Sequence, residues 1–579
     1  MIKVENLSYS FPQKDLFDNI SFTLEEGQHA AFIGSNGTGK STLIQMLMDP
    51  ERFMFDGKIE LEQNCRIGYV SQFSQLDRAD EVTVFEYIAS EFIRLQDDIT
   101  EICTKMETAT ELDELLEQYQ QVLDAFNAID GDNFENNIHK KLNLANLDKH
   151  ENLMVSKLSG GEFKLIQVIR EMLTCPDLMI MDEPDVFLDF ENLNALKDLI
   201  NAHKGILLVV THNRYLLNHC FNKIIHLENK DLQEFDGRYI DYNFSLLQRK
   251  IELQELAIAD TEEIERNQKL VTKLRVTATL HAEAANGKSL KARVKHLERL
   301  EARRIKAPFV EIKQPDIHFT AENPQEDKVV LKVSGYRAAF DSLLLDHVDF
   351  EIKSTEKVAL IGPNGTGKTT LLRDIYHNDQ PSITVADDVN VAFLSQIQDE
   401  MLTESNTIFD EFYDIGFQTA EAVTDYIKKF GFEEESLNQR IGSLSGGEKN
   451  MIQLAKISAG KADLLLLDEP TSHLDTYSQI ALEKAVENYD GAVLMVSHDF
   501  YTIANCVDYV LLIENQTIRK MSNRKFRQMI YAKHFDKDYL EIEQKKKAVE
   551  TKIELALKDM NFELAQVLSE ELESLIELL

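Results

Sequence analysis

The sequence is poor in cysteine and has no long apolar run. Its five cysteines are scattered and form no Cys-x-x-Cys pair, which argues against a disulfide framework and against a zinc site. Apolar runs such as GILLVV and DLLLLD have the length of a strand, far below the roughly 18 residues of a membrane span. The first residues, MIKVENLSYSF, lack the basic-then-apolar layout of a signal peptide. We therefore expect a cytoplasmic protein.

Positive charge is also scarce. Lys and Arg number 62 against 100 Asp and Glu, and the formal net charge of −38 disfavours general adhesion to nucleic acid or to an anionic membrane. Residues 269–306 are the exception, with eleven Lys and Arg and three Glu. Positive charge concentrated in one segment of an acidic protein predicts that this segment lies against a polyanion.

The chain of 579 residues is long enough for about three to four domains and contains an internal repeat. AAFIGSNGTGKSTLIQML is echoed by VALIGPNGTGKTTLLRDI, and SKLSGGEFKLIQVIREM by GSLSGGEKNMIQLAKIS, in the same order. In both halves the LSGGE serine precedes the Glu of Asp-Glu-Pro by 24 residues, and that Glu precedes a His by 29. The constant spacing indicates two copies of one functional unit.

Three segments outside the repeat have helical patterns. Gln72 and Ser159 are 87 residues apart whereas Gln396 and Ser445 are 49 apart, and the additional residues of the first half predict a protruding helical arm. The segment between the halves is helix-forming except near AANGKS, which predicts an antiparallel hairpin with arms of about 45 Å. The last 45 residues predict an acidic helix pair that turns near Asp559–Asn561.

Two stretches fit the phosphate-binding pattern G-x-x-x-x-G-K-[S/T], each between a short apolar strand and a helical pattern. Backbone N–H groups of such a loop surround phosphate oxygens, and the following helix N-terminus adds its positive end. Lys40 and Lys368 are expected to reach the β- and γ-phosphates, and Ser41 and Thr369 to offer hydroxyls to Mg²⁺. The predicted ATP-binding residues of the two loops are Gly34, Ser35, Asn36, Gly37, Thr38, Gly39, Lys40, Ser41, Thr42, Gly362, Pro363, Asn364, Gly365, Thr366, Gly367, Lys368, Thr369 and Thr370.

Two Asp-Glu pairs follow apolar runs of the buried-strand type. A carboxylate is costly there unless it serves a cation, so we expect Asp182 and Asp468 to hold Mg²⁺. The adjacent Glu183 and Glu469 are predicted to polarise the attacking water as general bases. A lone histidine or glutamine in such a place is often structural, but matching positions in both halves favour a catalytic role for His212 and His498, and a role at Mg²⁺ and water for Gln72 and Gln396.

The combination of phosphate-binding loop, LSGGE, Asp-Glu and His resembles the nucleotide-binding domains of the ATP-binding-cassette (ABC) family, over about 450 of the 579 residues. The resemblance implies an α/β fold with two P-loop domains packed head to tail and two ATP molecules at their interface. Each LSGGE then faces the opposite loop. The ATP-binding residues added by the resemblance are Ser159, Gly160, Gly161 and Glu162 for the nucleotide of Lys368, Ser445, Gly446, Gly447 and Glu448 for that of Lys40, and Phe11 as the aromatic that stacks on adenine.

Two cassettes in one chain, a long charged linker and an arm in the first cassette resemble the ABC-F branch of this family, as do TVFEYI and KSLKARVKHLERLE. The implied plan is a first cassette at 1–243 with its arm at about 90–135, a basic helical hairpin linker at 244–308, a second cassette at 324–532 and a C-terminal helical pair at 533–579. The implied activity is that of an ATPase whose monomeric, ATP-closed form binds the ribosome near the E site. It would act as a translation factor or as an antibiotic-resistance (ribosome-protection) factor. Contacts to ribosomal RNA and P-site tRNA are expected from the linker tip, at Lys273, Arg275, Lys288, Lys291, Arg293 and Lys295.

Two other classes stay open. A DNA- or RNA-remodelling ATPase would call for a basic C-terminal coil, whereas residues 536–579 carry twelve acids and six bases. The energising ATPase subunit of a transporter would need neither the basic hairpin nor the arm.

The two Asp-Glu-Pro stretches differ in the three residues after the proline. The first reads DEPDVFLD and the second DEPTSHLD, so Asp185-Val186-Phe187 stands where the second copy has Thr471-Ser472-His473. The resemblance places this turn at the interface between the cassettes. We therefore hypothesise that both halves work and that the two ATP sites are unequal.

Overall fold

The computed structural model contains two compact units. One comprises Met1–Arg238 and Lys313–His534, and the other Tyr239–Ile312 and Phe535–Leu579. The residues that the structure describes are 2–11, 14–62, 65–72, 82–108, 112–186, 188–252, 266, 268–272, 294, 314–322, 327–339, 343–397, 400–534 and 539–579.

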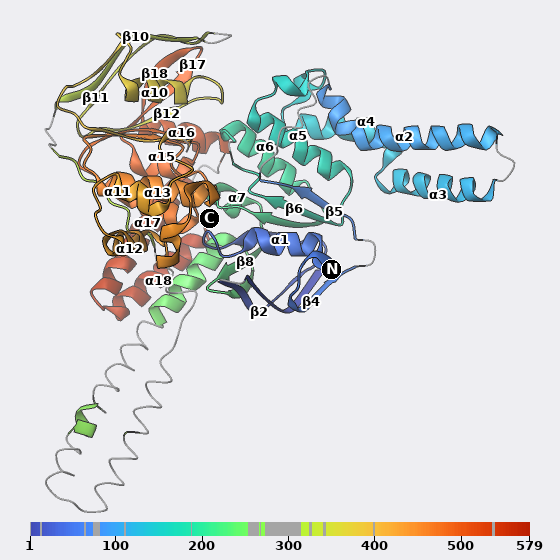
Figure 1. Cartoon of the computed structure of the whole chain (residues 1–579), viewed down its shortest axis with the longest axis horizontal. Coiled ribbons are helices and arrows are strands. Elements are labelled where there is room, and N and C mark those ends of the chain that lie inside the picture. Colours follow the sequence, from blue (N-terminus) through green and yellow to red (C-terminus); the bar gives the residue numbers. More distant parts are fainter. Residues whose placement is uncertain are drawn as a thin grey trace, which may run out of the picture. The chain divides into compact units, whose positions relative to one another are not determined.

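The first unit holds two cassettes with the same arrangement of sheets, and the first carries the additional helices α2 and α3 (Figure 1). In the first cassette, a three-stranded antiparallel sheet has the order β2-β1-β4, and a six-stranded sheet has the order β5-β6-β7-β3-β8-β9. Its strands are β1 Ile2–Phe11, β2 Lys14–Leu24, β3 His29–Ile33, β4 Asp56–Leu61, β5 Ile67–Val70, β6 Leu178–Asp182, β7 Ile206–Val210, β8 Lys223–Glu228 and β9 Asp231–Asp236. Its helices are α1 Lys40–Met48, α2 Val84–Thr108, α3 Asp113–Ala128, α4 Phe134–Leu144, α5 Gly160–Leu173, α6 Phe190–Asn201 and α7 Arg214–His219.

The second cassette repeats this plan with the orders β11-β10-β13 and β14-β15-β16-β12-β17-β18. Its strands are β10 Val329–Ala339, β11 Leu343–Lys353, β12 Lys357–Ile361, β13 Ile383–Val385, β14 Val391–Leu394, β15 Leu464–Asp468, β16 Ala492–Val496, β17 Tyr509–Glu514 and β18 Thr517–Ser522. Its helices are α10 Lys368–His377, α11 Ile408–Tyr413, α12 Ala420–Ile427, α13 Gly446–Ala459, α14 Thr476–Glu487, α15 Phe500–Cys506 and α16 Asn523–His534.

The central strands of both large sheets are parallel and fully buried. β6, β7, β15 and β16 read LMIMD, ILLVV, LLLLD and AVLMV, and every one of their residues is buried. Strands covered by helices on both faces need apolar side chains at every position rather than at alternate positions. Because these strands are parallel, the helices that follow them begin at the same edge of each sheet. The predicted site residues lie at that edge.

The predicted helical arm is present as α2 and α3, which project together from the first cassette (Figure 1). Leu95, Ile102 and Phe126 are buried in the described part of the pair. Helix α2 begins at Val84, before the expected start near residue 90, because Thr83 and Glu86 cap it: the Glu86 N–H donates to Thr83 Oγ1 at 3.2 Å, and the Thr83 N–H to Glu86 Oε2 at 2.9 Å. The first turns of α2 are part of the cassette, since Val84, Ile88 and Phe92 are buried.

The second unit contains the predicted C-terminal helical extension. Residues 239–252 are helical, and α17 Tyr539–Lys558 and α18 Phe562–Ile576 form an antiparallel pair that turns where the sequence predicts. Ile251 packs in one apolar cluster with Val549, Ile553, Leu568 and Leu572. Most of the predicted hairpin linker, with Lys273, Arg275, Lys288, Lys291, Arg293 and Lys295, lies outside the described residues.

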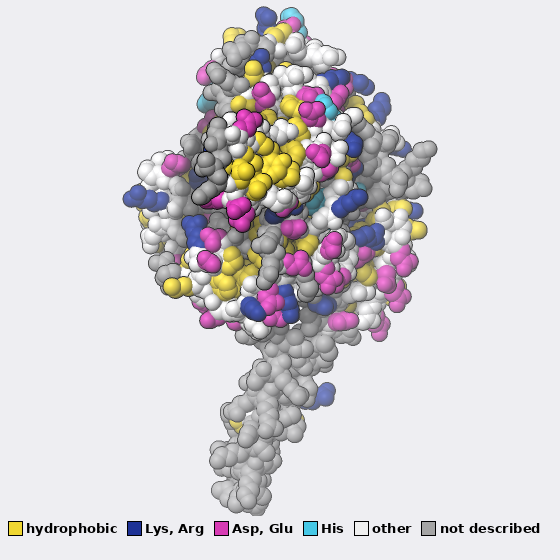
Figure 2. Space-filling view, turned by 90° about the vertical axis from the view of Figure 1, so that its right-hand side faces the viewer, with side chains coloured by type: hydrophobic (Ala, Val, Ile, Leu, Met, Phe, Trp, Pro, Cys, Tyr) yellow, Lys and Arg dark blue, Asp and Glu magenta, His cyan; other side chains and the backbone are white. Residues whose placement is uncertain are grey.

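The α/β fold of two P-loop cassettes with a helical insertion and a C-terminal extension is thus confirmed. Of the helices that the structure describes, none is long and apolar enough to cross a membrane. On the face shown in Figure 2, acidic side chains are scattered among basic and apolar ones rather than gathered in one area, for the residues drawn in colour.

Candidate active sites

Each phosphate-binding loop connects a buried strand to a helix, β3 to α1 in the first cassette and β12 to α10 in the second. The Lys40 Nζ donates to the carbonyl oxygens of Gly34 at 2.8 Å and Ser35 at 3.0 Å. The Lys368 Nζ donates to the corresponding carbonyls of Gly362 and Pro363, both at 2.8 Å. Burial lowers the pKa of both ammonium groups. The two lysines therefore lie over their own loops in the same way.

The magnesium candidates Asp182 and Asp468 end β6 and β15 beside the loops. Burial raises the pKa of each carboxyl to about 6. Within the described part of the chain, neither carboxylate oxygen of Asp468 has a hydrogen-bond partner. A buried carboxylate in this condition is costly unless a cation neutralises it, so these residues fit a metal ion held together with the adjacent Ser41 and Thr369 hydroxyls.

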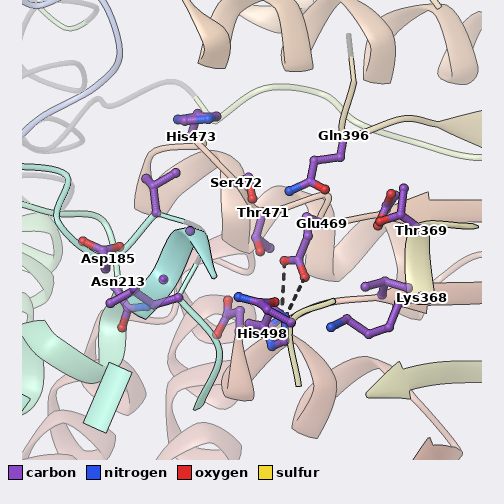
Figure 3. Close-up of a pocket in the computed structure, with 18 of the residues that line it drawn as sticks. Asp185, Asn213, Lys368, Thr369, Gln396, Glu469, Thr471, Ser472, His473 and His498 are labelled. Atoms are coloured by element: carbon purple, nitrogen blue, oxygen red, sulfur yellow. Dashed lines mark hydrogen bonds and ion pairs between the residues drawn. The ribbon is translucent and has the colours of Figure 1, made fainter. Parts of the chain in front are cut away.

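The two predicted general bases have different partners, although both have left-handed backbones, with φ of 46° at Glu183 and 49° at Glu469. Glu183 Oε2 accepts a hydrogen bond of 2.5 Å from Gln72 Nε2 and lies 3.3 Å from Nδ1 of His473, a residue of the other cassette. Glu469 contacts a histidine of its own cassette. Its Oε2 accepts from the backbone N–H of His498 at 3.3 Å, and its Oε1 lies 3.5 Å from Nε2 of the same histidine (Figure 3).

These partners change the charge state of the two carboxyl groups. Burial, assisted by the nearby Asp468, raises the pKa of Glu469 to about 8. Burial acts in the same direction on Glu183, but the hydrogen bond with His473 and the positive charge of Lys40 help to outweigh it, and the pKa of Glu183 is lowered. The pKa values of the two carboxyl groups are therefore shifted in opposite directions.

A cavity of about 500 Å³ contains the loop of the second cassette and the signature of the first (Figure 3). This volume lies within the range of small-molecule sites. We call the region around the loop of the second cassette the second site, and the region around the loop of the first cassette the first site. The predicted members of the cavity from the second cassette are Asn364, Gly365, Gly367, Lys368, Thr369, Thr370, Gln396, Asp468, Glu469 and His498. Its members from the first cassette include Ser159, Gly160, Gly161, Asp185, Val186 and Leu188. Glu183, His212 and His473 of the first site line the same cavity, which therefore extends to that site.

The LSGGE residues also stabilise their own helices. Ser159 and Glu162 form a capping box at the start of α5, and Ser445 and Glu448 form the same box at the start of α13. The serine and glutamate of this motif thus have a local structural role, while Gly160 and Gly161 form part of the cavity wall.

The cassettes contact each other across both loops. The backbone N–H of Asn36 donates to Asp475 Oδ2 at 3.2 Å, and its side-chain amide donates to the carbonyl oxygen of His473 at 2.8 Å. At the second site, the backbone N–H of Asn364 donates to Asp189 Oδ2 at 3.3 Å. Each loop therefore receives the Asp that ends the Asp-Glu-Pro stretch of the opposite cassette.

The two predicted catalytic histidines follow β7 and β16 and are buried. Burial, followed by the charge of Lys40, lowers the pKa of His212 to about 4. Burial and Lys368 lower that of His498 to about 3. Both imidazoles are therefore neutral near pH 7 and can donate or accept one hydrogen bond at each nitrogen.

Phe11 lies at the end of β1, and its side chain is 46% exposed. Its ring makes an edge contact with Tyr9, with centroids 5.3 Å apart. This exposed aromatic surface is accessible to a planar ligand.

A buried cation and a buried anion in the first cassette were not predicted from the sequence. The Lys164 Nζ donates to the carbonyl oxygens of Ser71 and Gln72, and burial lowers its pKa to about 8. Asp185 Oδ1 accepts from Thr211 Oγ1 at 2.7 Å, and burial raises the pKa of this carboxyl to about 6.

The second cassette has Asn450 and Thr471 at the positions of Lys164 and Asp185. The Asn450 amide donates to the carbonyl oxygens of Pro470 at 3.1 Å and Ser472 at 2.9 Å. A position-by-position comparison of the two halves would have revealed the exchange of a neutral pair for a charged one.

Comparison with known proteins agrees with this geometry. The sequence profile of the family described as ABC transporter matches residues 17–186 and 345–472. Over 535 residues the chain is 30% identical to the putative ATP-binding protein YdiF of Bacillus subtilis, covering 90% of this chain and 81% of YdiF. It is 28% identical to the energy-dependent translational throttle protein EttA of Escherichia coli, over 86% of this chain and 89% of EttA. The solved structure titled RNase-L Inhibitor superposes with a TM-score of 0.55 at 18% identity, covering 92% of both chains, which supports the fold.

The fold and the paired loops define a tandem P-loop ATPase that binds ATP. The chain belongs to the ABC transporter family, as a tandem-cassette protein of the ABC-F type.

Proposed function

We propose that this ATPase acts on the ribosome, and that its ATP-closed form is the one that binds. The observation that carries the proposal is the head-to-tail pairing, in which the second-site cavity combines the loop of one cassette with Ser159, Gly160 and Gly161 of the other. ATP bound there would contact both cassettes and favour the closed state in which they meet. The relative named translational throttle protein supports translation as the process concerned.

The roles that we assign to the loop residues are the same in both sites. Lys40 and Lys368 would turn from their loop carbonyls to the β- and γ-phosphates, where backbone N–H groups of the loop and helix N-terminus also point. Asp182 with Ser41, and Asp468 with Thr369, would hold Mg²⁺ together with Gln72 and Gln396. When bound, Mg²⁺ would neutralise charge that develops on the phosphate oxygens.

Hydrolysis would use Glu183 and Glu469 as general bases that take a proton from the attacking water. The neutral imidazoles of His212 and His498 would donate a hydrogen bond to the γ-phosphate. The LSGGE residues Ser159 to Glu162 and Ser445 to Glu448 would complete the nucleotide-binding site of the opposite loop. Phe11 would lie against the adenine of the nucleotide in the first site. Hydrolysis removes the γ-phosphate contacts and so favours opening and release from the ribosome.

The ribosome-facing part is proposed to be the basic linker, with phosphate contacts from its Lys and Arg. A monomer of this kind would act in the cytoplasm, with ribosomal RNA and P-site tRNA as its partners. Both a translation factor and a ribosome-protection factor for antibiotic resistance fit this proposal.

The test is the double substitution Glu183→Gln with Glu469→Gln in the full chain. Hydrolysis should slow by at least ~10²-fold, and the protein should sediment with ribosomes through sucrose when ATP is present. The control is Lys40→Ala with Lys368→Ala, which should stay in the supernatant because it does not retain ATP. A Gln double variant that also stays in the supernatant would contradict ribosome binding. A variant lacking residues 280–295 should keep ribosome-independent ATP hydrolysis and lose its effect on translation.

A further inference from the structure

The turn that carries His473 has a backbone that both cassettes hold in place. His473 has a φ of 59°, a left-handed conformation that is uncommon for a residue other than glycine. Its carbonyl oxygen accepts the hydrogen bond from the Asn36 side chain of the first cassette. A Cβ at Gly447 would lie 2.5 Å from the same carbonyl oxygen, so the signature of the second cassette also packs closely against the turn. Sparsely populated backbone conformations persist where the surroundings impose them, often at functional sites.

This backbone directs the imidazole into the first site. His473 Nδ1 lies 3.3 Å from Glu183 Oε2 and 3.5 Å from Gln72 Nε2, and the side chain is 11% exposed. Gln72 Nε2 in turn donates to the same Oε2 of Glu183. One carboxylate oxygen is therefore held by two side chains, of which one belongs to each cassette.

The second site lacks the equivalent residue. Phe187 stands at the position of His473, and its phenyl ring has no nitrogen or oxygen with which to hold Glu469; the placement of Phe187 lies outside the described residues. Glu469 instead contacts the backbone and ring of His498 in its own cassette. The interface contacts of Asp475 and Asp189 are equivalent, so each phosphate-binding loop meets the opposite cassette in the same way while the partner of the general base differs.

We propose that His473 is a positioning residue supplied in trans, which aims the Glu183 carboxylate at the attacking water, so that the first site is complete only when the cassettes meet. In the second site, Glu469 is positioned by His498 of its own cassette, and no equivalent of the His473 contact is needed for this. The proposal rests on the proposed role of Glu183 as general base. It assigns the two general bases different supports: Glu183 is positioned by a side chain of the opposite cassette, and Glu469 by His498 of its own cassette.

The experiment measures each site by itself in the full chain. Glu469→Gln leaves the first site as the source of turnover, and Glu183→Gln leaves the second. In each background, His473 is changed to Phe, which the chain itself carries at the equivalent position. With Glu469→Gln, we expect H473F to lower kcat about 10-fold or more while KM for ATP stays within about 2-fold, because misplacing a reacting group acts on the chemical step. In the Glu183→Gln background, the fold-decrease in kcat caused by H473F should be at least about five times smaller.

A further variant separates positioning from folding. Asparagine adopts left-handed backbone readily and places an amide nitrogen close to the position of Nδ1, so His473→Asn in the Glu469→Gln background should recover at least half of the kcat that H473F loses.

The outcomes distinguish the two proposals. Equal kcat losses from H473F in both backgrounds, a rise in KM without a change in kcat, or no recovery by His473→Asn would each overturn the positioning role. Full turnover in Glu183→Gln with Glu469→Gln would instead overturn the general-base assignment on which it rests.

Discussion

Arg214 of the first cassette donates a hydrogen bond of 2.8 Å to Asp499 of the second and forms an ion pair with Glu483 as well. Its guanidinium carbon also lies 4.9 Å from the centre of the Tyr501 ring. The three charged side chains are between 9% and 16% exposed, and the surrounding carboxylates raise the pKa of Arg214 despite its burial. The ion pairs of Arg214 join the two cassettes, and Phe500 stands at the equivalent position in the second cassette.

We expect Arg214→Ala to lower the free energy of unfolding of the unit by about 3 to 5 kcal/mol, because Glu483 and Asp499 would remain buried without a cation. Chemical denaturation followed by circular dichroism measures the loss. Arg94→Ala on the arm is the control, since the ion pairs of Arg94 are surface-exposed and should contribute no more than about 0.5 kcal/mol. Adding Glu483→Gln and Asp499→Asn to Arg214→Met should restore most of the stability; failure to do so would mean that packing, not charge, is lost.

The first cassette has the charged residues Lys164 and Asp185 where the second cassette has neutral ones. This difference predicts energetic coupling between Lys164 and Asp185. Each single change, Asp185→Thr or Lys164→Asn, should destabilise by about 1 to 3 kcal/mol, because one buried charge loses its counterpart. The double variant reproduces the Asn450 and Thr471 pair of the second cassette, and should recover at least half of the summed loss. A double-mutant cycle from denaturation curves gives the interaction energy, and additive losses would show that the two charges act independently.

Gly447 is predicted to tolerate no side chain. A Cβ there would lie 2.4 Å from Asn36 Nδ2 and 2.5 Å from the His473 carbonyl oxygen, two atoms that meet only at the first site. In the Glu469→Gln background, which leaves the first site as the source of turnover, Gly447→Ala should therefore lower kcat about 10-fold or more, through displacement of the turn that carries His473. Gly460→Ala is the matched control at the other end of the same helix, since its nearest neighbour would be the Ile457 carbonyl oxygen at 3.6 Å. Equal activity of the two variants would refute the close approach at Gly447.

His29 and His203 predict a loss of stability in acid. Their rings lie 6.2 Å apart, and burial, with a contribution from His29, lowers the pKa of His203 to about 4 from 6.5. Between these two pKa values the unfolded state binds a proton at His203 that the folded state does not bind. The stability that the neutral His203 contributes is therefore fully present above pH 6.5 and is lost as pH falls from 6.5 toward 4. Between pH 7 and pH 5 we expect a loss of about 1 to 2 kcal/mol that His203→Gln reduces.

The sequence predicts the local parts of the site well because each part is set by short-range chemistry. Gly39 before α1, the Ser159 and Glu162 capping box and the buried carboxylate at the end of β6 all follow from residue types a few positions apart. The contacts between cassettes were not predictable in detail. His473 and Glu183 are 290 residues apart, and Arg214 and Asp499 are 285 apart, so no periodicity or spacing links them. The signal that exists is the difference between equivalent positions, such as His473 against Phe187.

The aspartate that ends each Asp-Glu-Pro stretch divides its two oxygens between two tasks. Asp475 Oδ1 caps α14 through the Ser478 N–H at 2.8 Å, and Asp189 Oδ1 caps α6 through the Asn192 N–H at 3.0 Å, while both Oδ2 atoms reach the opposite loop. Parting the cassettes would break the Oδ2 bond and leave the helix end intact, with water taking the place of the loop N–H. The contact between the cassettes can therefore break and form again in every ATP cycle without unfolding of either helix N-terminus.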